Sequence, residues 1–370
     1  MGVVKIHRDF EIENISFRKT SQIKDKNISR INYLLQYGKY QSTLDVEDID
    51  FTAQDATSLQ KTCLEHTKEN DNTIPVNDDL EAAKVFFHKH FFSMFVCMLT
   101  GLYTLMFIPS IARLLFYTKK SDNPIKAFNR YLSTLNHTVQ WYFSPKERTK
   151  SLKKVRKLHA MAVKQTLSKV KDENCVVTDN GAVPMSQFDL VVTQWAFIGA
   201  ALTRPKSIGL CDVTTRELHL LTNQMYKVGR DLGISNEFNL CSGTLEETIQ
   251  YAKDIENYVI IPALELNQDF ESMAGHLMKG VNILNPFIDP LAFSAWTHKI
   301  FGAQKSYHKR REMLVSYKSR IFYHLHDFLF EWVLKNNFLN WVVIGFFNTL
   351  MDLTGQLHEK FRILRNELPI

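Results

Sequence analysis

Glycine, proline and cysteine are all scarce in this sequence. The 370 residues include 14 glycines and 10 prolines, which excludes a collagen-like or a disordered low-complexity chain. The five cysteines lie far apart and form no CxxC pair. This spacing excludes a disulfide scaffold and a cysteine-rich metal site, and it favours reduced thiols in a fold that faces the cytosol. Phenylalanine, by contrast, occurs 26 times, and so many large rings with so few turn residues indicate long helices around a bulky apolar interior.

Other missing features narrow the function classes. The sequence contains no Gly-rich phosphate loop, no convincing strand ladder and no repeat of fixed period. The first residues carry charge from Lys5 onward and include no apolar h-region. We therefore expect an intracellular protein, at the ER membrane or the cytosolic surface of a membrane, and not a secreted one. The net charge of +6 permits an anionic membrane surface as a partner, and we expect no nucleic-acid partner.

Long apolar-periodic segments dominate the sequence from residue 79 onward, and they predict helices to the end of the chain. Residues 1–78 are polar and predict a loosely structured or packing extension. Gly233 is placed to end a helix in the left-handed conformation. Three capping boxes predict helix starts, each with an acid three residues on: Ser186, Thr214 and Thr244. The predicted fold class is all-α, a single large helical bundle of roughly ten helices.

Residues 91–112 form a run without charge that is long enough to cross a bilayer. Two interpretations are open: a central helix buried on all sides, or a transmembrane helix or monotopic insertion. A second uncharged run, residues 336–351, is short for a span and predicts a buried or interfacial helix. The basic run at 305–312 predicts a solvated face or a contact with anionic lipid head groups. Residues 301–370 are therefore expected to form C-terminal helices that associate with a membrane.

Polar side chains stand on core-facing stripes of two predicted helices. His159 lies on such a stripe in a helix over residues 151–170, where an imidazole is either a satisfied core residue or the axial ligand that a haem requires. One face of the preceding helix carries a cation, a hydroxyl, an imidazole and an indole: Arg130, Thr134, His137 and Trp141. This face is either the wall of a polar pocket or a solvated edge.

Several further polar residues carry weaker signals. Thr193 and Gln194 interrupt a strongly apolar helix, where a polar group without a partner is costly, so a hydrogen-bond partner is expected there. Two His-x-His pairs alternate along their helices, so their members point to different faces and make poor metal sites: His88 with His90, and His324 with His326.

The order of four segments resembles the rubber-oxygenase family. That family includes bacterial latex-clearing proteins and ER-bound oxygenases, among them a fungal enzyme that cleaves a prenyl side chain. The four segments are RYLST (130–134), VRKLHA (155–160), FDLVVTQWAFIG (188–199) and GRDLGISNEFNLC (229–241). The likeness covers residues 81–260 and is closer to the animal members than to the bacterial ones. It implies a helical catalytic domain over residues 79–300 that surrounds a haem pocket.

The resemblance implies haem b as the cofactor, with its iron held by His159 as the proximal ligand. Arg130 and Thr134 reproduce an Arg-x-x-x-Thr pair that lines the distal side in the bacterial enzymes, where a guanidinium and a hydroxyl stabilise negative charge on bound dioxygen. Apolar walls would accept an isoprenoid or another lipid-like substrate. The chain departs from the bacterial pattern in two places. Ser133 stands where those enzymes have a lysine, and no acid is found around residues 114–115, where they have a glutamate.

These departures leave different functions open. The first is a haem-dependent oxidoreductase that uses dioxygen on a hydrophobic substrate other than polyisoprene, with His137 as a candidate replacement for the distal polar group. The second is a non-catalytic, membrane-associated helical protein that keeps the fold as a lipid-binding or interaction module. The third is an integral membrane protein anchored by residues 91–112.

Overall fold

The structure, a computed structural model, describes residues 29–43, 76–173, 184–266, 271–284, 288–346 and 348–349. These residues form the fourteen α-helices named below and a further apolar helix, Asn337–Phe346, and they contain no strand beyond an isolated bridge between Ser42 and Ser186. The predicted all-α class is confirmed, whereas the predicted number of roughly ten helices is too low. The excess comes from short helices, such as the six residues Ile261–Leu266, that periodicity alone does not separate from their neighbours.

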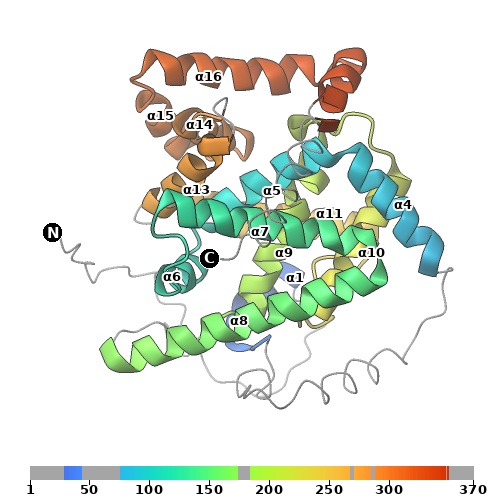
Figure 1. The fold of residues 1–370 in the computed structure, drawn as a ribbon, viewed down its shortest axis with the longest axis vertical. Coiled ribbons are helices and arrows are strands. Elements are labelled where there is room, and N and C mark those ends of the chain that lie inside the picture. Colours follow the sequence, from blue (N-terminus) through green and yellow to red (C-terminus); the bar gives the residue numbers. More distant parts are fainter. Residues whose placement is uncertain are drawn as a thin grey trace, which may run out of the picture.

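The helices follow one another along the chain with short connections in most places, and Figure 1 shows their arrangement. The α-helices are α1 (Arg30–Tyr37), α4 (Val76–Lys89), α5 (Phe91–Leu105), α6 (Pro109–Tyr117), α7 (Pro124–Phe143), α8 (Pro145–Glu173), α9 (Gln187–Thr203), α10 (Thr215–Asp231), α11 (Leu245–Ile255), α12 (Ile261–Leu266), α13 (Glu271–Leu284), α14 (Pro290–Ile300), α15 (Gln304–Glu312) and α16 (Tyr317–Phe328). In that view α16 lies across the upper end of the molecule and α8 crosses its lower part.

The core of the bundle is built on α5 and α9, which pack closely against each other. Gly101 lies at the closest approach, because a Cβ atom built there would stand 1.9 Å from the carbonyl oxygen of Ala196. Trp195 is fully buried on α9, and its Nε1 donates to the carbonyl oxygen of Ala252 on α11 at 3.0 Å. The apolar run of residues 91–112 is thus surrounded by protein over most of its first helix.

This apolar run is two helices and not one. The α5 helix ends at Leu105, where the Thr104 hydroxyl donates to the Gly101 carbonyl at 2.7 Å, and α6 begins four residues later at Pro109. Among the described residues no single helix is long and apolar enough to cross a bilayer. One bent pair of segments passes that test, Leu80–Lys89 with Phe91–Leu105, and its two halves meet at an angle of 83°.

The predicted helix boundaries are confirmed at four points. All three capping boxes form, with the hydroxyl accepting from the third helical N–H and the acid accepting from the N-cap N–H: Ser186 with Asp189, Thr214 with Glu217, and Thr244 with Glu247. Gly233 ends α10 with a φ of 98°, the left-handed conformation that glycine adopts without strain.

Part of the predicted polar extension packs into the same core. Ile31 and Leu34 of α1 are buried, and the Arg30 guanidinium stacks 4.2 Å from the ring centre of Tyr251 on α11. The Thr43 hydroxyl donates to the Met185 carbonyl at 2.8 Å. Most of residues 1–78 lie outside the described part of the chain, and residues 29–43 are a packing segment.

Candidate functional site

The two helices that carry the predicted site residues pack side by side. The α7 helix begins where the Asn123 side chain accepts from the Lys126 N–H, and Pro124 occupies its first turn. The chain turns at Ser144 into α8. His137 of α7 and Ser151 of α8 join the two helices through a contact of 2.8 Å between Nδ1 and Oγ. His137 thus forms a helix–helix contact, and its proposed use as a distal polar group stays a prediction.

His159 presents a buried ring nitrogen that has no partner. Its Nδ1 atom is inaccessible to solvent and makes no hydrogen bond. Burial lowers the pKa of His159 to about 4, and the positive charges of Arg156 and Arg130 add to the shift. The imidazole is therefore neutral at physiological pH, which is the form that binds iron.

Arg130 is a partly buried cation whose positive charge lowers the pKa of His159. Burial alone lowers the pKa of Arg130 to about 10, and no carboxylate of the described residues contributes to its pKa. Its Nη1 donates to the Ser121 hydroxyl at 3.0 Å. A desolvated guanidinium without a counter-ion is costly, so this arrangement favours an anionic or polar ligand beside it.

Thr134 lies one turn after Arg130 on α7, as the spacing predicts. Its hydroxyl donates to the Arg130 carbonyl at 3.1 Å, and the Thr138 hydroxyl donates in turn to the Thr134 carbonyl at 2.9 Å. These bonds occupy the hydroxyl hydrogen of Thr134 within the helix and leave its oxygen available to accept a hydrogen bond. The three predicted residues thus come from two adjacent helices, and the positive charge of Arg130 lowers the pKa of His159.

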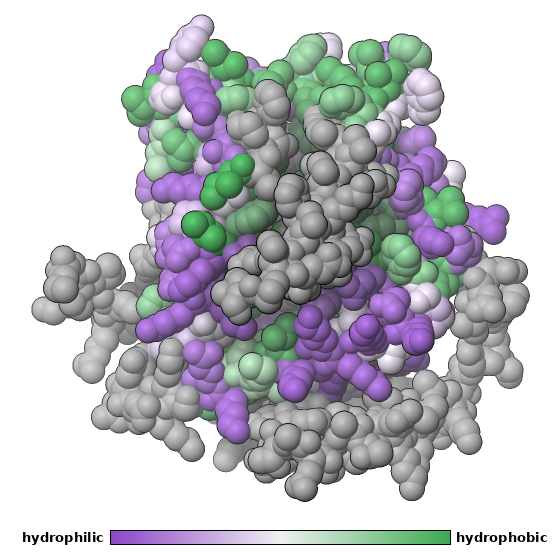
Figure 2. Space-filling model, in the orientation of Figure 1, coloured by the Kyte–Doolittle hydropathy of each residue, from purple (hydrophilic) through white to green (hydrophobic). Residues whose placement is uncertain are grey.

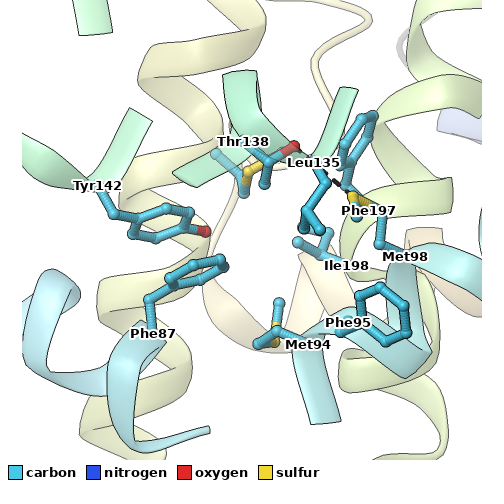
Figure 3. A pocket seen from close by; sticks show the side chains of 10 residues that line it. Phe87, Met94, Phe95, Met98, Leu135, Thr138, Tyr142, Phe197 and Ile198 are labelled. Carbon is cyan, nitrogen blue, oxygen red and sulfur yellow. Dashed lines mark hydrogen bonds between the residues drawn. The ribbon is translucent and has the colours of Figure 1, made fainter. Parts of the chain in front are cut away.

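An apolar cavity lies on the neighbouring face of α7 (Figure 3). Its volume is about 10 Å³, which is room for roughly one water molecule, whereas pockets for organic ligands measure about 300–1,000 Å³. The lining comes from α4, α5, α7, α9 and α10, and it includes three methionines: Met94, Met98 and Met225. None of the three predicted site residues lines this cavity, so it is distinct from the predicted haem pocket. Methionine side chains are flexible and repack around ligands more readily than branched ones do.

The side chains of His159 and Arg130 are chemically suited to hold a haem. A neutral imidazole with an unpartnered nitrogen could hold the iron, and a partly buried guanidinium without an acidic partner among the described residues would suit an anionic or polar group of the bound species. The described residues hold no cluster of three or more His, Cys, Asp or Glu side chains. That result does not bear on a haem, because haem iron takes only one or two ligands from the protein.

The polar residues inside the α9 segment have structural roles. Gln194 donates to the Met225 carbonyl at 2.8 Å and to the Asn239 side chain at 3.1 Å, and it accepts from the Leu240 N–H at 3.0 Å. The Thr193 hydroxyl donates to the Asp189 carbonyl at 2.7 Å. The expected hydrogen-bond partners are thus present, and they connect α9 to α10 and to the loop after it.

The His-x-His pairs behave as their spacing predicts. His326 is buried while His324 is exposed, and His90 is buried while His88 is exposed. His90 faces Glu217 of α10 at 3.6 Å. Neither pair brings both imidazoles to one place.

Asp189 is a buried carboxylate that sequence reasoning treated only as a helix cap. It accepts from the Ser110 hydroxyl in the first turn of α6 at 2.5 Å, and burial raises its pKa. A carboxylate therefore lies at the start of α6, the helix that contains residues 114–115, although the sequence itself has no acid around those two positions. The capping box of α9 was the available signal, but it does not reveal which neighbouring helix the carboxylate reaches.

Sequence reasoning missed a second polar cluster, which joins α5, α14 and α15. His298 contacts the Ser306 hydroxyl through Nδ1 at 2.7 Å and the Tyr103 hydroxyl through Nε2 at 3.3 Å. The Ser294 hydroxyl lies 2.5 Å from that of Tyr103 and accepts from Arg310 Nη1 at 2.9 Å. Arg310 belongs to the basic run for which a solvated face or a contact with lipid head groups was predicted, yet it is buried and its guanidinium lies 5.3 Å from the ring centre of Phe107. The cluster holds the C-terminal helices to the core.

His298 is expected to make the protein sensitive to acid. Burial lowers its pKa to about 2, with Arg310 adding to the shift, whereas the unfolded chain binds a proton near pH 6.5. Stability therefore falls as the pH decreases below about 6.5, because only the unfolded state gains the proton. Between pH 8 and pH 5 protonation of this residue in the unfolded chain should lower the free energy of unfolding by about 2 kcal/mol. Urea unfolding of the wild type and of His298→Gln at both pH values measures the difference, and an identical pH dependence would contradict the assignment.

Comparison of this chain with known protein families, with curated proteins and with solved structures finds no match. The resemblance to the rubber-oxygenase family therefore stays a prediction from the sequence, and the arguments below depend on the geometry around His159.

Proposed function

We propose that this protein is a haem-b-dependent oxidoreductase that uses dioxygen on a hydrophobic, isoprenoid or lipid-like substrate. The observation that carries the proposal is the unpartnered nitrogen of the neutral His159, together with the partly buried Arg130, whose charge acts on His159 and whose pKa is influenced by no carboxylate of the described residues. When bound, the haem would supply the iron chemistry that activates dioxygen.

The chain's own residues would hold the cofactor and shape the site. His159 would hold the iron through its imidazole on α8, and Arg130 would offer hydrogen-bond donors from α7 to a negatively charged or polar group at the site. Because both side chains are partly buried and already positioned on their helices, little reorganisation would be needed. The methionine-lined cavity beside α7 provides apolar walls that exclude water and can widen around an alkyl or isoprenoid chain.

A second function is favoured by two specific observations. The cavity volume of about 10 Å³ is far below that of a substrate pocket, and Ser133 replaces the lysine of the bacterial enzymes. Both suit a non-catalytic helical module that binds lipid or another protein and keeps the fold without the oxygenase chemistry.

Oxygen uptake separates these two functions. Haem-loaded, reduced protein is mixed with squalene, an isoprenoid alkene, and the rate of dioxygen consumption is followed. We expect uptake by the wild type, and we expect Arg130→Leu to lower it about hundredfold, since removal of one preorganised donor costs factors of this size. The exposed Arg216→Leu on α10 serves as the control and should leave the rate unchanged. Haem-loaded protein that consumes no dioxygen with squalene or with an unsaturated fatty acid would favour the non-catalytic module.

A further inference from the structure

An apolar stripe runs along the solvent side of α16 and into the π-helical turn Leu329–Val333 that follows it. Its members recur at intervals of four, four, three and four residues, and each is at least 48% exposed: Tyr317, Ile321, Leu325, Phe328 and Trp332. The opposite side packs onto the bundle through Ser319, Tyr323, His326 and Phe330. This is the reverse of an ordinary surface helix, which turns its most apolar side inward.

The next helix, Asn337–Phe346, extends the exposed apolar surface. Asn340 anchors it, because its side-chain amide donates to the Gly209 carbonyl at 2.9 Å and to the Leu334 carbonyl at 2.8 Å. Away from this anchor the exposed side chains are large and apolar: Phe338, Leu339, Trp341, Val342 and Phe346. Figures 1 and 2 show that hydrophobic residues gather at the end of the molecule where α16 lies. We call the stripe and these five residues together the C-terminal apolar face.

The surroundings of this face are basic. Residues 305–335 contain six exposed Lys and Arg side chains and three acidic ones. Two of the three acids are already neutralised by ion pairs, Asp327 with Lys299 and Glu331 with Lys335. The face therefore combines exposed aromatic and aliphatic side chains with an excess of positive charge.

We infer that the C-terminal apolar face docks onto a membrane leaflet that contains anionic lipid. The stripe stands on the outer side of a straight helix, so it forms a ridge that suits a plane better than it would fill a groove in a protein partner. Trp332 and Trp341, 73% and 74% exposed, are of the residue type that favours the interface between head groups and acyl chains. The surrounding Lys and Arg attract anionic head groups, and the apolar side chains add the burial that makes such attachment stable. The surface would attach the protein to one leaflet without crossing it.

This inference does not depend on the proposed haem chemistry. The face lies on α16 and on Asn337–Phe346, whereas Arg130 and His159 lie on α7 and α8. Vesicle binding by haem-free protein would therefore support the docking surface whether or not the oxidoreductase proposal holds. A protein that binds haem but no vesicles would contradict only the inference of a membrane-docking surface.

Co-sedimentation of the full chain with vesicles tests the docking surface. Two vesicle compositions are used, phosphatidylcholine alone and phosphatidylcholine with one third phosphatidylserine. We expect tighter binding to the anionic vesicles, weakened by added salt, and we expect Leu325→Ser/Trp332→Ser to lower the partition coefficient by at least about tenfold. The matched control is Val85→Ser/Tyr258→Ser, which removes two equally exposed apolar side chains elsewhere on the surface and should bind as the wild type does. Circular dichroism confirms that both variants are folded.

Three results would overturn the inference. The first is equal vesicle binding by the wild type and by Leu325→Ser/Trp332→Ser. The second is a dimer in sedimentation equilibrium that the same double variant dissociates, because the face would then join two copies of this chain. The third is shielding of Trp332 from acrylamide in the absence of vesicles, measured as the difference in fluorescence quenching between the wild type and Trp332→Phe, because the face would then be covered by another segment of the chain.

Discussion

Gly101→Ala is expected to destabilise the protein by about 3 kcal/mol or more, at the upper end of the cost of overpacking a core. A methyl group at this position would stand 1.9 Å from the Ala196 carbonyl oxygen and 2.6 Å from the Ala196 Cα atom. These are backbone atoms, so no side-chain rotation can relieve the clash, and α5 and α9 would have to move apart along the most extensive helix–helix contact of the bundle. Urea unfolding followed by circular dichroism measures the loss.

Gly275→Ala in α13 is the matched control. A Cβ atom there meets nothing within 4 Å, so the substitution should stabilise the helix by about 0.5–1 kcal/mol through the lower conformational entropy of alanine in the unfolded chain. Equal stabilities of Gly101→Ala and Gly275→Ala would show that α5 and α9 do not pack as described.

His159→Ala is expected to abolish haem binding. The imidazole is the candidate iron ligand, and no other described histidine has a pKa that the charge of Arg130 lowers. Titration of the haem-free variant with hemin should give no Soret band of protein-bound haem, whereas the wild type should saturate at one haem per chain. The variant should also remain folded, because the lost nitrogen makes no hydrogen bond in the structure.

The matched control is His137→Ala, on the helix that packs against α8. That substitution removes a contact between Nδ1 and the Ser151 hydroxyl and should lower stability by about 1 kcal/mol, while haem binding persists. A loss of haem in both variants would assign the effect to the contact between α7 and α8, and not to iron ligation by His159.

Local signals in the sequence predict the helix starts well. The capping boxes at Ser186, Thr214 and Thr244 need only a hydroxyl and an acid three residues apart, and all three form. The break inside residues 91–112 was not predicted. It arises because α5 ends at Leu105 and α6 begins at Pro109, in the first turn of a helix, where proline is well tolerated.

Helical periodicity predicts which site residues share a face of one helix, but it does not predict how two helices pack. The spacing of Arg130 and Thr134 places them one turn apart on one helix, and the structure shows them so. The effect of the Arg130 charge on the pKa of His159 depends on how α7 and α8 pack, which periodicity cannot show. The cluster around His298 was missed for the same reason, because Tyr103, Ser294 and Arg310 are far apart along the chain and meet only through the packing of α5, α14 and α15.

The size of the cavity is a property of packing and not of sequence pattern. The lining of this cavity is apolar, and the expected apolar walls around a substrate at the haem site stay a prediction. Its small volume follows from how closely the side chains of α5, α7 and α9 interdigitate, including Met98, whose sulfur lies 3.6 Å from the Thr138 hydroxyl. No count of apolar residues indicates whether such a space is open or filled.

The most direct test of the central claim is the haem content of the purified protein after incubation with hemin, quantified as the pyridine haemochrome together with the absorption spectrum. The account predicts one haem b per chain in the wild type, with a Soret band that is absent in His159→Ala. A wild type that retains no haem, or a His159→Ala variant that retains as much as the wild type, would contradict the assignment of His159 as the haem ligand.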